Sequence, residues 1–296
     1  MLRYTGAFCV PNDNNVRLKL DTVLVATDFS SASRMAMAYA MSIARRHRSK
    51  LLMAHVVSSQ SERAVMDGWR AGQSEVTEYV IAGRLEGIEH QLVVKSGDVW
   101  PVLAQMVSEY GVDLIVVGTH GRTGVRKLIL GSVAEGIFRQ SPCPVLTIGP
   151  NTDQDPQIGP ERILTPTGFA PHSLLAVRYA VLLARELHSS LALLHVVTDP
   201  EDPNAEERER LRKEREARLR DLVPSDAHLA APACFFVRFG SATEKILATA
   251  SEWNANLIVL GLRHVEESSR AESTWARAYE IVRQAGCPVM TIRMPG

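Results

Sequence analysis

The stretch D-L-I-V-V-G-T-H-G-R-T-G-V-R-K-L-I-L-G-S, at residues 113–132, joins a short apolar run to a segment rich in glycine. Residues 114–117 are apolar and mostly β-branched, and the run is too short for a helix, so it predicts a buried strand. Gly118 ends this strand. Gly121 and Gly124 keep Cβ atoms out of the following loop, which lets the backbone turn sharply and lets a ligand approach it closely.

The same stretch closes on the start of a further helix, because Ser132 after Gly131 is a good N-cap for the segment V-A-E-G-I-F-R-Q. A strand, a glycine loop and a helix N-terminus together offer free N–H groups and the positive end of a helix dipole. Arg122, Arg126 and Lys127 add positive charge. The stretch predicts a phosphate-binding loop, with a plain strand-to-helix connection as the alternative. Neither G-x-x-x-x-G-K-[ST] nor G-x-G-x-x-G occurs, which excludes a P-loop and the dinucleotide fingerprint.

Composition excludes several classes of protein. The chain has 296 residues, of which 46% are hydrophobic and 22% charged, so two domains with a core each are expected. Basic and acidic residues number 33 each, and a net charge of zero argues against a nucleic-acid or membrane-surface partner. No apolar run approaches the ~18 residues that span a bilayer, and residues 1–15 lack the apolar core of a signal peptide. We expect a cytoplasmic protein.

The cysteines and histidines give no sign of a structural metal. The four cysteines form no C-x-x-C pair, and the nine histidines show no zinc-binding spacing. Cys143 and Cys287 each precede a proline that leads into an expected strand, so both are expected to be small core residues. A reduced compartment is the expected setting.

The order of expected elements occurs twice, which is the clearest organisational feature of the chain. The segment R-I-L-T-P-T-G-F-A at 162–170 matches T-V-L-V-A-T-D-F-S at 22–30. The triplet His-Val-Val at 195–197 matches the one at 55–57, and Cys-Pro-Val at 287–289 matches 143–145. In the first copy we expect strands at 22–28, 51–57, 91–95, 114–117 and 145–148, and helices at 31–46, within 61–85, at 99–109 and after Ser132.

Strands that alternate with helices predict right-handed crossovers and a mainly parallel sheet. The fold class expected is therefore α/β: two tandem copies of a five-stranded, mainly parallel open sheet with helices on both faces, of Rossmann-like type. We expect an N-terminal arm at 1–20, a first domain at 21–150, a linker at 151–160 and a second domain at 161–296.

The pattern G-x2-G-x9-G-[ST], met by Gly118, Gly121, Gly131 and Ser132, resembles the ATP-binding motif of universal stress proteins. The duplicated order resembles the tandem two-domain type of that family. The resemblance implies an adenine-nucleotide α-hydrolase-like fold, ATP with Mg²⁺ or Mn²⁺ as ligands, and a role in stress response or signalling. The site expected from the resemblance lies in the first copy and consists of Ala26, Thr27, Asp28, Val56, Gly118, His120, Gly121, Arg122, Gly131, Ser132 and Val133.

In an open α/β sheet the ligand lies outside the carboxyl ends of the strands, where the strand order reverses. Asp28 is expected there to accept from ribose hydroxyls or to hold the metal beside the phosphates; the alternative is that it only caps the helix that follows. The backbone of Val56 is expected to contact a base edge. His55 is expected to be a core histidine, His120 could equally be solvent-exposed, and Ser132 could serve as an N-cap alone.

The second copy departs from the pattern. Asp28 becomes Gly168, Gly121 becomes His264, and positions 131 and 132 align with Thr274 and Trp275. Residues 262–273 contain two arginines against three glutamates, which should repel phosphate. We expect a degenerate domain that does not bind ATP in the family's manner. It is expected to pair through residues 289–292 with residues 145–148 as an intramolecular pseudo-dimer, and a homodimer of chains is also possible.

Three functions compete. The first is a nucleotide-binding stress or signalling protein with one ATP site per chain. The second is a slow ATPase or self-phosphorylating enzyme, for which the sequence offers no P-loop lysine and no nucleophile beside a base. The third is a scaffold with a relic nucleotide loop. Separately, the charge run at 201–222 predicts a heavily ion-paired exposed helix, with a docking surface as the alternative.

Overall fold

The computed structural model describes residues 18, 20–59, 61–119, 136–137, 140–152, 156, 159–198, 204–263 and 269–293, with the backbone alone for 269–274. The described residues fall into two compact units, one of residues 20–150 with 156 and 159, and one of residues 160–293 with 18 and 151–152. We call them the N-terminal domain and the C-terminal domain. Most of the expected arm and the whole loop at 120–135 lie outside the described residues.

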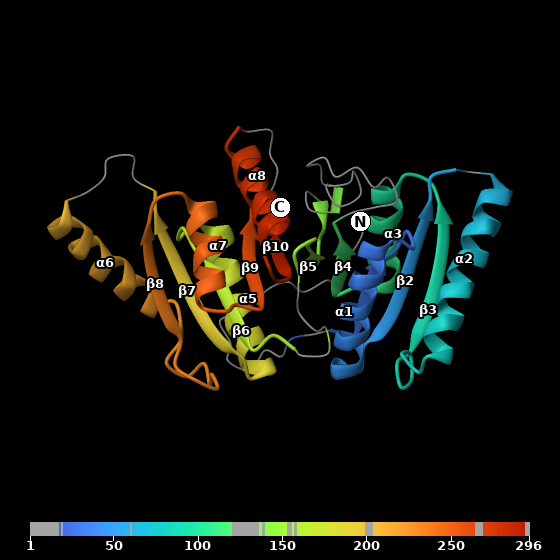
Figure 1. Ribbon diagram of the computed structural model, residues 1–296, viewed down its shortest axis with the longest axis horizontal. Coiled ribbons are helices and arrows are strands. Elements are labelled where there is room, and N and C mark those ends of the chain that lie inside the picture. Colours follow the sequence, from blue (N-terminus) through green and yellow to red (C-terminus); the bar gives the residue numbers. More distant parts are fainter. Residues whose placement is uncertain are drawn as a thin grey trace, which may run out of the picture. The chain divides into compact units, whose positions relative to one another are not determined.

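The N-terminal domain is a parallel sheet with helices packed against it (Figure 1). Its strands lie in the order β3-β2-β1-β4-β5, and neighbouring strands pair in parallel. In chain order the elements are β1 (Thr22–Ala26), α1 (Ser31–His47), β2 (Lys50–Val57), α2 (Glu62–Ile81), β3 (His90–Ser96), α3 (Val99–Tyr110), β4 (Leu114–Gly118) and β5 (Val145–Ile148).

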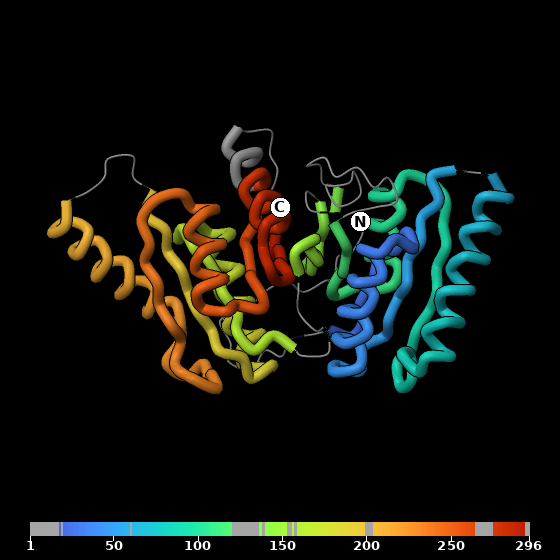
Figure 2. Tube along the Cα trace, in the orientation of Figure 1, coloured from blue at the N-terminus to red at the C-terminus, as the bar shows by residue number. Residues whose placement is uncertain are grey.

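The C-terminal domain repeats this arrangement, and its strands follow the order β8-β7-β6-β9-β10, again parallel. The repeat can be followed along the chain in Figure 2. The tandem copies and the parallel sheet expected from the sequence are confirmed. The elements are β6 (Arg162–Pro166), α5 (Pro171–Leu187), β7 (Ser190–Val197), α6 (Ala205–Arg220), β8 (Cys234–Phe239), α7 (Ala242–Glu252), β9 (Leu257–Leu262), α8 (Ser269–Gln284) and β10 (Val289–Arg293).

The central strands are buried on both faces, which explains their continuous apolar runs. Residues 23–25 of β1 have 0% exposure, and residues 114–117 of β4 are buried. Helix α1 packs against β1 and β4. In α1, Ala36, Ala40 and Ala44 are buried. Their small side chains let the helix lie close to the sheet.

In each domain the backbone at the end of the fourth strand packs directly against the backbone at the start of the first helix. A Cβ added to Gly118 would lie 2.5 Å from the carbonyl oxygen of Ala32 in α1. A Cβ added to Gly261, the matching residue of β9, would lie 2.1 Å from the carbonyl oxygen of His172 in α5. Backbone atoms cannot move aside as a flexible side chain can, so packing alone requires glycine at both positions.

Helix α2 lies directly on the sheet through two glycines. A Cβ on Gly68 would be 2.9 Å from Val57 Cγ2, and one on Gly72 would be 2.9 Å from Leu92 Cδ2. The same added atom on Gly72 would be 3.4 Å from Phe29 Cζ, in the turn after β1. At these two points the backbone of α2 therefore lies directly against the side chains of Val57, Leu92 and Phe29, with no side chain of its own between.

Helix α6 combines the expected ion pairs with contacts that the sequence did not predict. Glutamates and basic residues pair at helical spacing, for example Glu209 with Arg212 at 3.2 Å. Other arginines of α6 lie over aromatic rings: Arg220 over Phe235 of β8 at 4.9 Å, and Arg218 over Phe169 at 4.0 Å. The expected heavy ion pairing is confirmed, whereas the inner side of the helix is held to its domain by cation–π contacts.

Candidate functional site

The carboxyl ends of β1, β2 and β4 meet at one edge of the N-terminal sheet. Val25 of β1 pairs with Met53 of β2 and with Val116 of β4. Two residues further along each strand, the chain reaches the level of Thr27, His55 and Gly118. Because β1 lies between β2 and β4, the strand order reverses beside it, which is where open α/β sheets bind ligands.

The turn after β1 is held by its own side chains. Thr27 is buried, and its hydroxyl donates to Ser33 Oγ at 3.2 Å and accepts the Phe29 N–H at 3.1 Å. Phe29 has a φ of +64°, a left-handed conformation that non-glycine residues seldom adopt. The side chain of Thr27 thus braces the turn, and only its backbone remains to face a ligand.

Asp28 forms an Asx turn and does not cap the helix. Its carboxylate accepts the Ser30 N–H at 3.1 Å, an interaction that holds a short loop in shape. The N-cap of α1 is Ser30, whose hydroxyl accepts the Ser33 N–H at 3.3 Å. The alternative interpretation of Asp28 as the helix cap is therefore wrong. The Asp28 residue is partly exposed at the strand ends.

His55 is a core residue, as expected. It is buried, its Nδ1 lies 2.8 Å from the carbonyl oxygen of Thr27, and its ring centre lies 4.4 Å from that of Phe29. A carbonyl oxygen only accepts, so Nδ1 carries the proton and donates. His55 thus supports the turn from the side of β2.

Val56 and Gly118 complete the described part of the expected site. The Thr27 N–H donates to the carbonyl oxygen of Ala54 at 2.9 Å. Parallel strands bond through alternate residues, so the backbone groups of Val56 face the same side as those of Ala54, beyond the end of β1. Gly118 ends β4, and the Thr119 N–H after it donates to Ile148 of β5 at 3.2 Å.

The structure thus brings five of the expected residues to one edge, Ala26, Thr27, Asp28, Val56 and Gly118. The other expected residues, His120, Gly121, Arg122, Gly131, Ser132 and Val133, lie outside the described residues. Within the part of the chain that the structure describes, no three His, Cys, Asp or Glu side chains come together as a metal site. Asp28 would therefore need ligands from the loop, the nucleotide or water to hold a cation.

Cys143 and Cys287 are core residues, as expected. Both are buried, and burial raises the pKa of each thiol to about 12. The Cys143 thiol also lies 3.7 Å from the Ser141 hydroxyl. Because the thiolate is the nucleophilic form, both thiols are unreactive at neutral pH.

The C-terminal domain has the same turn with a different ligand-facing residue. Thr167 Oγ1 lies 3.0 Å from Ser173 Oγ and accepts the Phe169 N–H at 3.0 Å, and His195 Nδ1 lies 2.8 Å from the Thr167 carbonyl oxygen. Phe169 has a φ of +61°. Gly168 replaces Asp28, is exposed, and a Cβ added to it would meet nothing within 4 Å. Neither packing nor backbone conformation requires glycine there.

Beyond Gly261 the C-terminal domain has little room for a long loop. Helix α8 begins at Ser269, eight residues after Gly261. Thr274 and Trp275, which the motif spacing aligns with Gly131 and Ser132, therefore lie inside α8 and not at its start. No G-x9-G-S segment precedes this helix.

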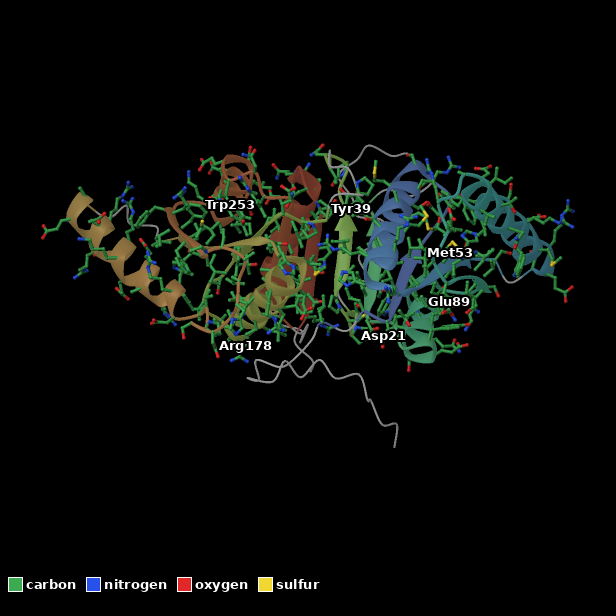
Figure 3. All side chains as sticks on the ribbon, turned by 90° about the horizontal axis from the view of Figure 1, so that it is seen from below. Asp21, Tyr39, Met53, Glu89, Arg178 and Trp253 are labelled. Carbon is green, nitrogen blue, oxygen red and sulfur yellow. The ribbon has the colours of Figure 1, made fainter. Side chains whose placement is uncertain are left out.

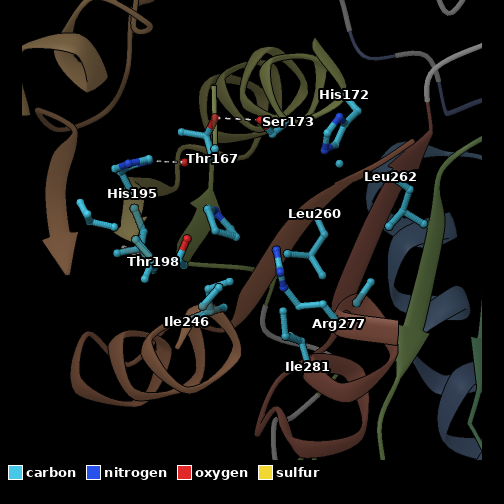
Figure 4. Close-up of a pocket in the computed structure, with 18 of the residues that line it drawn as sticks. Thr167, His172, Ser173, His195, Thr198, Ile246, Leu260, Leu262, Arg277 and Ile281 are labelled. Carbon is cyan, nitrogen blue, oxygen red and sulfur yellow. Dashed lines mark hydrogen bonds between the residues drawn. The ribbon is translucent and has the colours of Figure 1, made fainter. Parts of the chain in front are cut away.

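A cavity of about 560 Å³ opens at the carboxyl ends of β6, β7 and β9 (Figure 4). No pattern in the sequence predicts this cavity. Its apolar wall is formed from four elements by Leu194, Ile246, Leu260, Leu262 and Ile281. Thr167, Ser173 and His195 of the braced turn and its support also line it, with the two contacts between them drawn in Figure 4.

Four basic side chains line this cavity, and none of the described residues that line it is acidic. Arg277 extends from α8 toward the space between Leu260 and Ile246 (Figure 4), and Arg215 comes from α6. Burial lowers the pKa of His195, which Arg215 and Arg218 lower further. Burial and then Arg263 lower the pKa of His172. At neutral pH the positive charge of the cavity therefore resides on its arginines.

Comparison with known proteins points to one family. The model of the Universal stress protein family matches residues 19–149 and again residues 160–293. A universal stress protein of Staphylococcus haemolyticus is 30% identical over 160 residues, covering 50% of this chain and 95% of that protein. The structure of a universal stress protein from Archaeoglobus fulgidus superposes with a TM-score of 0.69 at 18% identity, covering 94% of this chain and 97% of the other.

A further solved universal stress protein carries cAMP. It is 30% identical, covers 43% of this chain and 96% of its own, and has a TM-score of 0.35. Among the described helices of the present chain, none is both long and apolar enough to span a membrane.

Proposed function

Since this chain belongs to the universal stress protein family, we propose that its N-terminal domain binds ATP with Mg²⁺ or Mn²⁺ in a stress or signalling role. One observation carries the proposal. The ends of β1, β2 and β4 meet where the strand order reverses, and β4 leads directly into the segment that carries the G-x2-G-x9-G-S pattern. Such strand ends followed by a glycine loop are suited to a nucleotide with its phosphates on backbone N–H groups.

Each part of the site has a separate task in this proposal. Asp28, placed at the strand ends by its Asx turn, accepts from the ribose hydroxyls or helps to hold the cation. The backbone of Val56 contacts the base edge. His120, Gly121, Arg122, Gly131, Ser132 and Val133 surround the phosphates, and Ser132 also caps the following helix. Occupancy by the nucleotide then stabilises the domain or shifts its choice of partner.

The C-terminal domain does not bind ATP in this manner, according to the same proposal. It lacks the carboxylate of Asp28, because Gly168 stands in its place. Its fourth helix begins eight residues after Gly261, which leaves no glycine loop for a chain of phosphates. We therefore propose one nucleotide per chain.

Titration calorimetry of the full chain with ATP and magnesium tests this function. We expect about one site per chain, lost in Gly131→Val because the added side chain blocks the phosphate loop, and weakened about tenfold in Asp28→Ala. Asp67→Ala is the matched control, because Asp67 is an exposed aspartate of α2 with only a surface ion pair to Arg70. Two equivalent sites per chain, or ATP binding that is unchanged in Gly131→Val, would contradict the proposal.

Further measurements identify the nucleotide and distinguish the proposed function from its two alternatives, an enzyme and a scaffold. Competition of ATP against AMP and cAMP identifies the preferred nucleotide, and cAMP is included because it is bound in a solved family member. Turnover of ATP that is fast and depends on Gly131 would favour the enzyme. Absence of any nucleotide binding would favour the scaffold with a relic loop.

The pairing of residues 289–292 with residues 145–148 and the assembly of two chains into a dimer remain predictions. Sedimentation of the full chain at increasing concentration measures the second directly.

A further inference from the structure

We propose that the cavity of the C-terminal domain binds a small organic anion with an apolar body, such as an aryl or alkyl carboxylate, sulfonate or monophosphate. Its volume of about 560 Å³ falls within the range typical of small-molecule sites, about 300–1,000 Å³. The inference does not depend on nucleotide binding by the N-terminal domain.

The chemistry of the lining indicates the ligand class. One wall is apolar over β7, β9, α7 and α8, and suits a hydrocarbon or aromatic body. The second feature is positive charge from Arg277 and Arg215, on two different helices, with no acidic side chain among the described residues that line the cavity. An anion with an apolar body satisfies both features, whereas a cation with an apolar body or a fully polar anion satisfies only one.

The two arginines are available to a ligand to different degrees. Arg277 is exposed and has no ion pair among the described residues. Arg215 pairs with Glu214 at 3.2 Å, but its Nε is buried and has no hydrogen-bond partner in the described part of the chain. A planar guanidinium with unused N–H groups is suited to an anionic oxygen. Arg277 is therefore the expected anchor, and Arg215 contributes charge.

The same geometry argues against a nucleoside triphosphate. Gly168 leaves no carboxylate for a ribose, and both arginines belong to helices and not to a phosphate loop.

Fluorescence titration of the full chain with anilinonaphthalene sulfonate, an aromatic anion, tests the inference. The titration is run with ATP and magnesium in excess, so that a nucleotide site in the N-terminal domain is occupied. We expect saturable binding of one dye per chain, displaced by naphthalene sulfonate and not by uncharged naphthalene methanol. Arg277→Gln should raise the dissociation constant about tenfold or more, because a charge-assisted contact is lost.

Two variants make the result specific. Arg178→Gln removes an exposed arginine of α5 that does not line the cavity (Figure 3) and should leave dye binding unchanged. Gly168→Leu places a side chain at the cavity lining, where an added Cβ meets nothing within 4 Å, and should weaken binding without unfolding the domain. Thermal unfolding of each variant checks that it remains folded.

Several outcomes would overturn the inference. They are an absence of saturable dye binding, equal effects of Arg277→Gln and Arg178→Gln, and equal binding of the uncharged analogue. Arg277-dependent dye binding that appears only when ATP is left out of the titration would identify a nucleotide site instead. Failure of the calorimetric test with ATP would remove the proposed function of the N-terminal domain but would leave the Arg277-dependent dye binding intact.

Discussion

The turn after β1 and the turn after β6 share the contacts of their threonine, phenylalanine and histidine but differ in the residue between the threonine and the phenylalanine. In both, a threonine hydroxyl accepts the N–H of a phenylalanine with positive φ, and a histidine Nδ1 contacts the threonine carbonyl oxygen at 2.8 Å. Between the threonine and the phenylalanine stands Asp28 in one domain and Gly168 in the other. The residues shared by the two halves therefore hold the fold, and the residue that differs is free to carry function.

Glycine at the end of the fourth strand belongs to the shared framework, and its replacement should have the largest effect. Gly118→Val and Gly261→Val should each destabilise their own domain by about 3 kcal/mol, since the new side chain meets backbone of the first helix. Gly168→Ala is the matched control and should change stability little. Calorimetric unfolding of the three variants measures this. If Gly261→Val left the stability of the C-terminal domain unchanged, the close contact of Gly261 with α5 would be contradicted.

The supporting histidines should come next. His55→Ala and His195→Ala each leave a carbonyl oxygen of the turn without its partner and a gap beside a phenylalanine ring. We expect each change to lower the free energy of unfolding of its domain by about 2 kcal/mol. Only His55→Ala should also weaken ATP binding, which calorimetry can measure. If both changes affected ATP equally, the assignment of the nucleotide to one domain would be wrong.

Exchanging the residues at positions 28 and 168 tests directly whether they determine the difference between the domains. Asp28→Gly should weaken ATP binding about tenfold, whereas Gly168→Asp should not create a second ATP site, because α8 begins too soon after Gly261. Gly168→Asp should instead weaken binding of the dye, because it adds a carboxylate to the lining of a cavity that contains arginines. Titrations of both ligands with both variants give the four values. A gain of ATP binding in Gly168→Asp would show that the carboxylate alone had been missing.

The smallest expected effect is a pH dependence of the C-terminal domain. Burial lowers the pKa of His195 and His172 below their ordinary value of 6.5, so the unfolded chain binds more protons than the folded one below that pH. The free energy of unfolding should be constant above about pH 7 and fall as the pH decreases through 6.5. Urea unfolding at about pH 7.5 and about pH 5.5 measures this. His195→Gln should reduce the difference, and an unchanged difference would contradict the assignment to His195.

The order of elements was predictable because it rests on apolar periodicity and on repetition. Strand β5 and the helices around residues 31–46 and 99–109 were expected within a residue or two of their observed bounds. The contacts inside each turn were harder to predict from the sequence. Thr27 and Gly118 were expected to contact a ligand, yet both positions are already required by the fold, so their presence alone says little about binding.

Two features of the C-terminal domain gave no usable signal in the sequence. The contacts of α6 join arginines to phenylalanines of β8 and to Phe169, and such pairs follow no apolar period. The cavity combines side chains from β6, β7 and β9 with others from α5 to α8. The absence of acidic residues among them becomes visible only when these segments are brought together. An arginine in the last helix, Arg277, was the one residue that could have suggested it.

The two bare contacts of α2 have a mechanical consequence. At Gly68 and Gly72 the helix backbone lies directly against the side chains of Val57, Leu92 and Phe29, and closely packed interiors transmit displacement. A shift of Phe29 on nucleotide loading should therefore be passed to the whole outer helix. Trp69 lies between these glycines in sequence and is 45% exposed, so the chain contains its own fluorophore for following that movement.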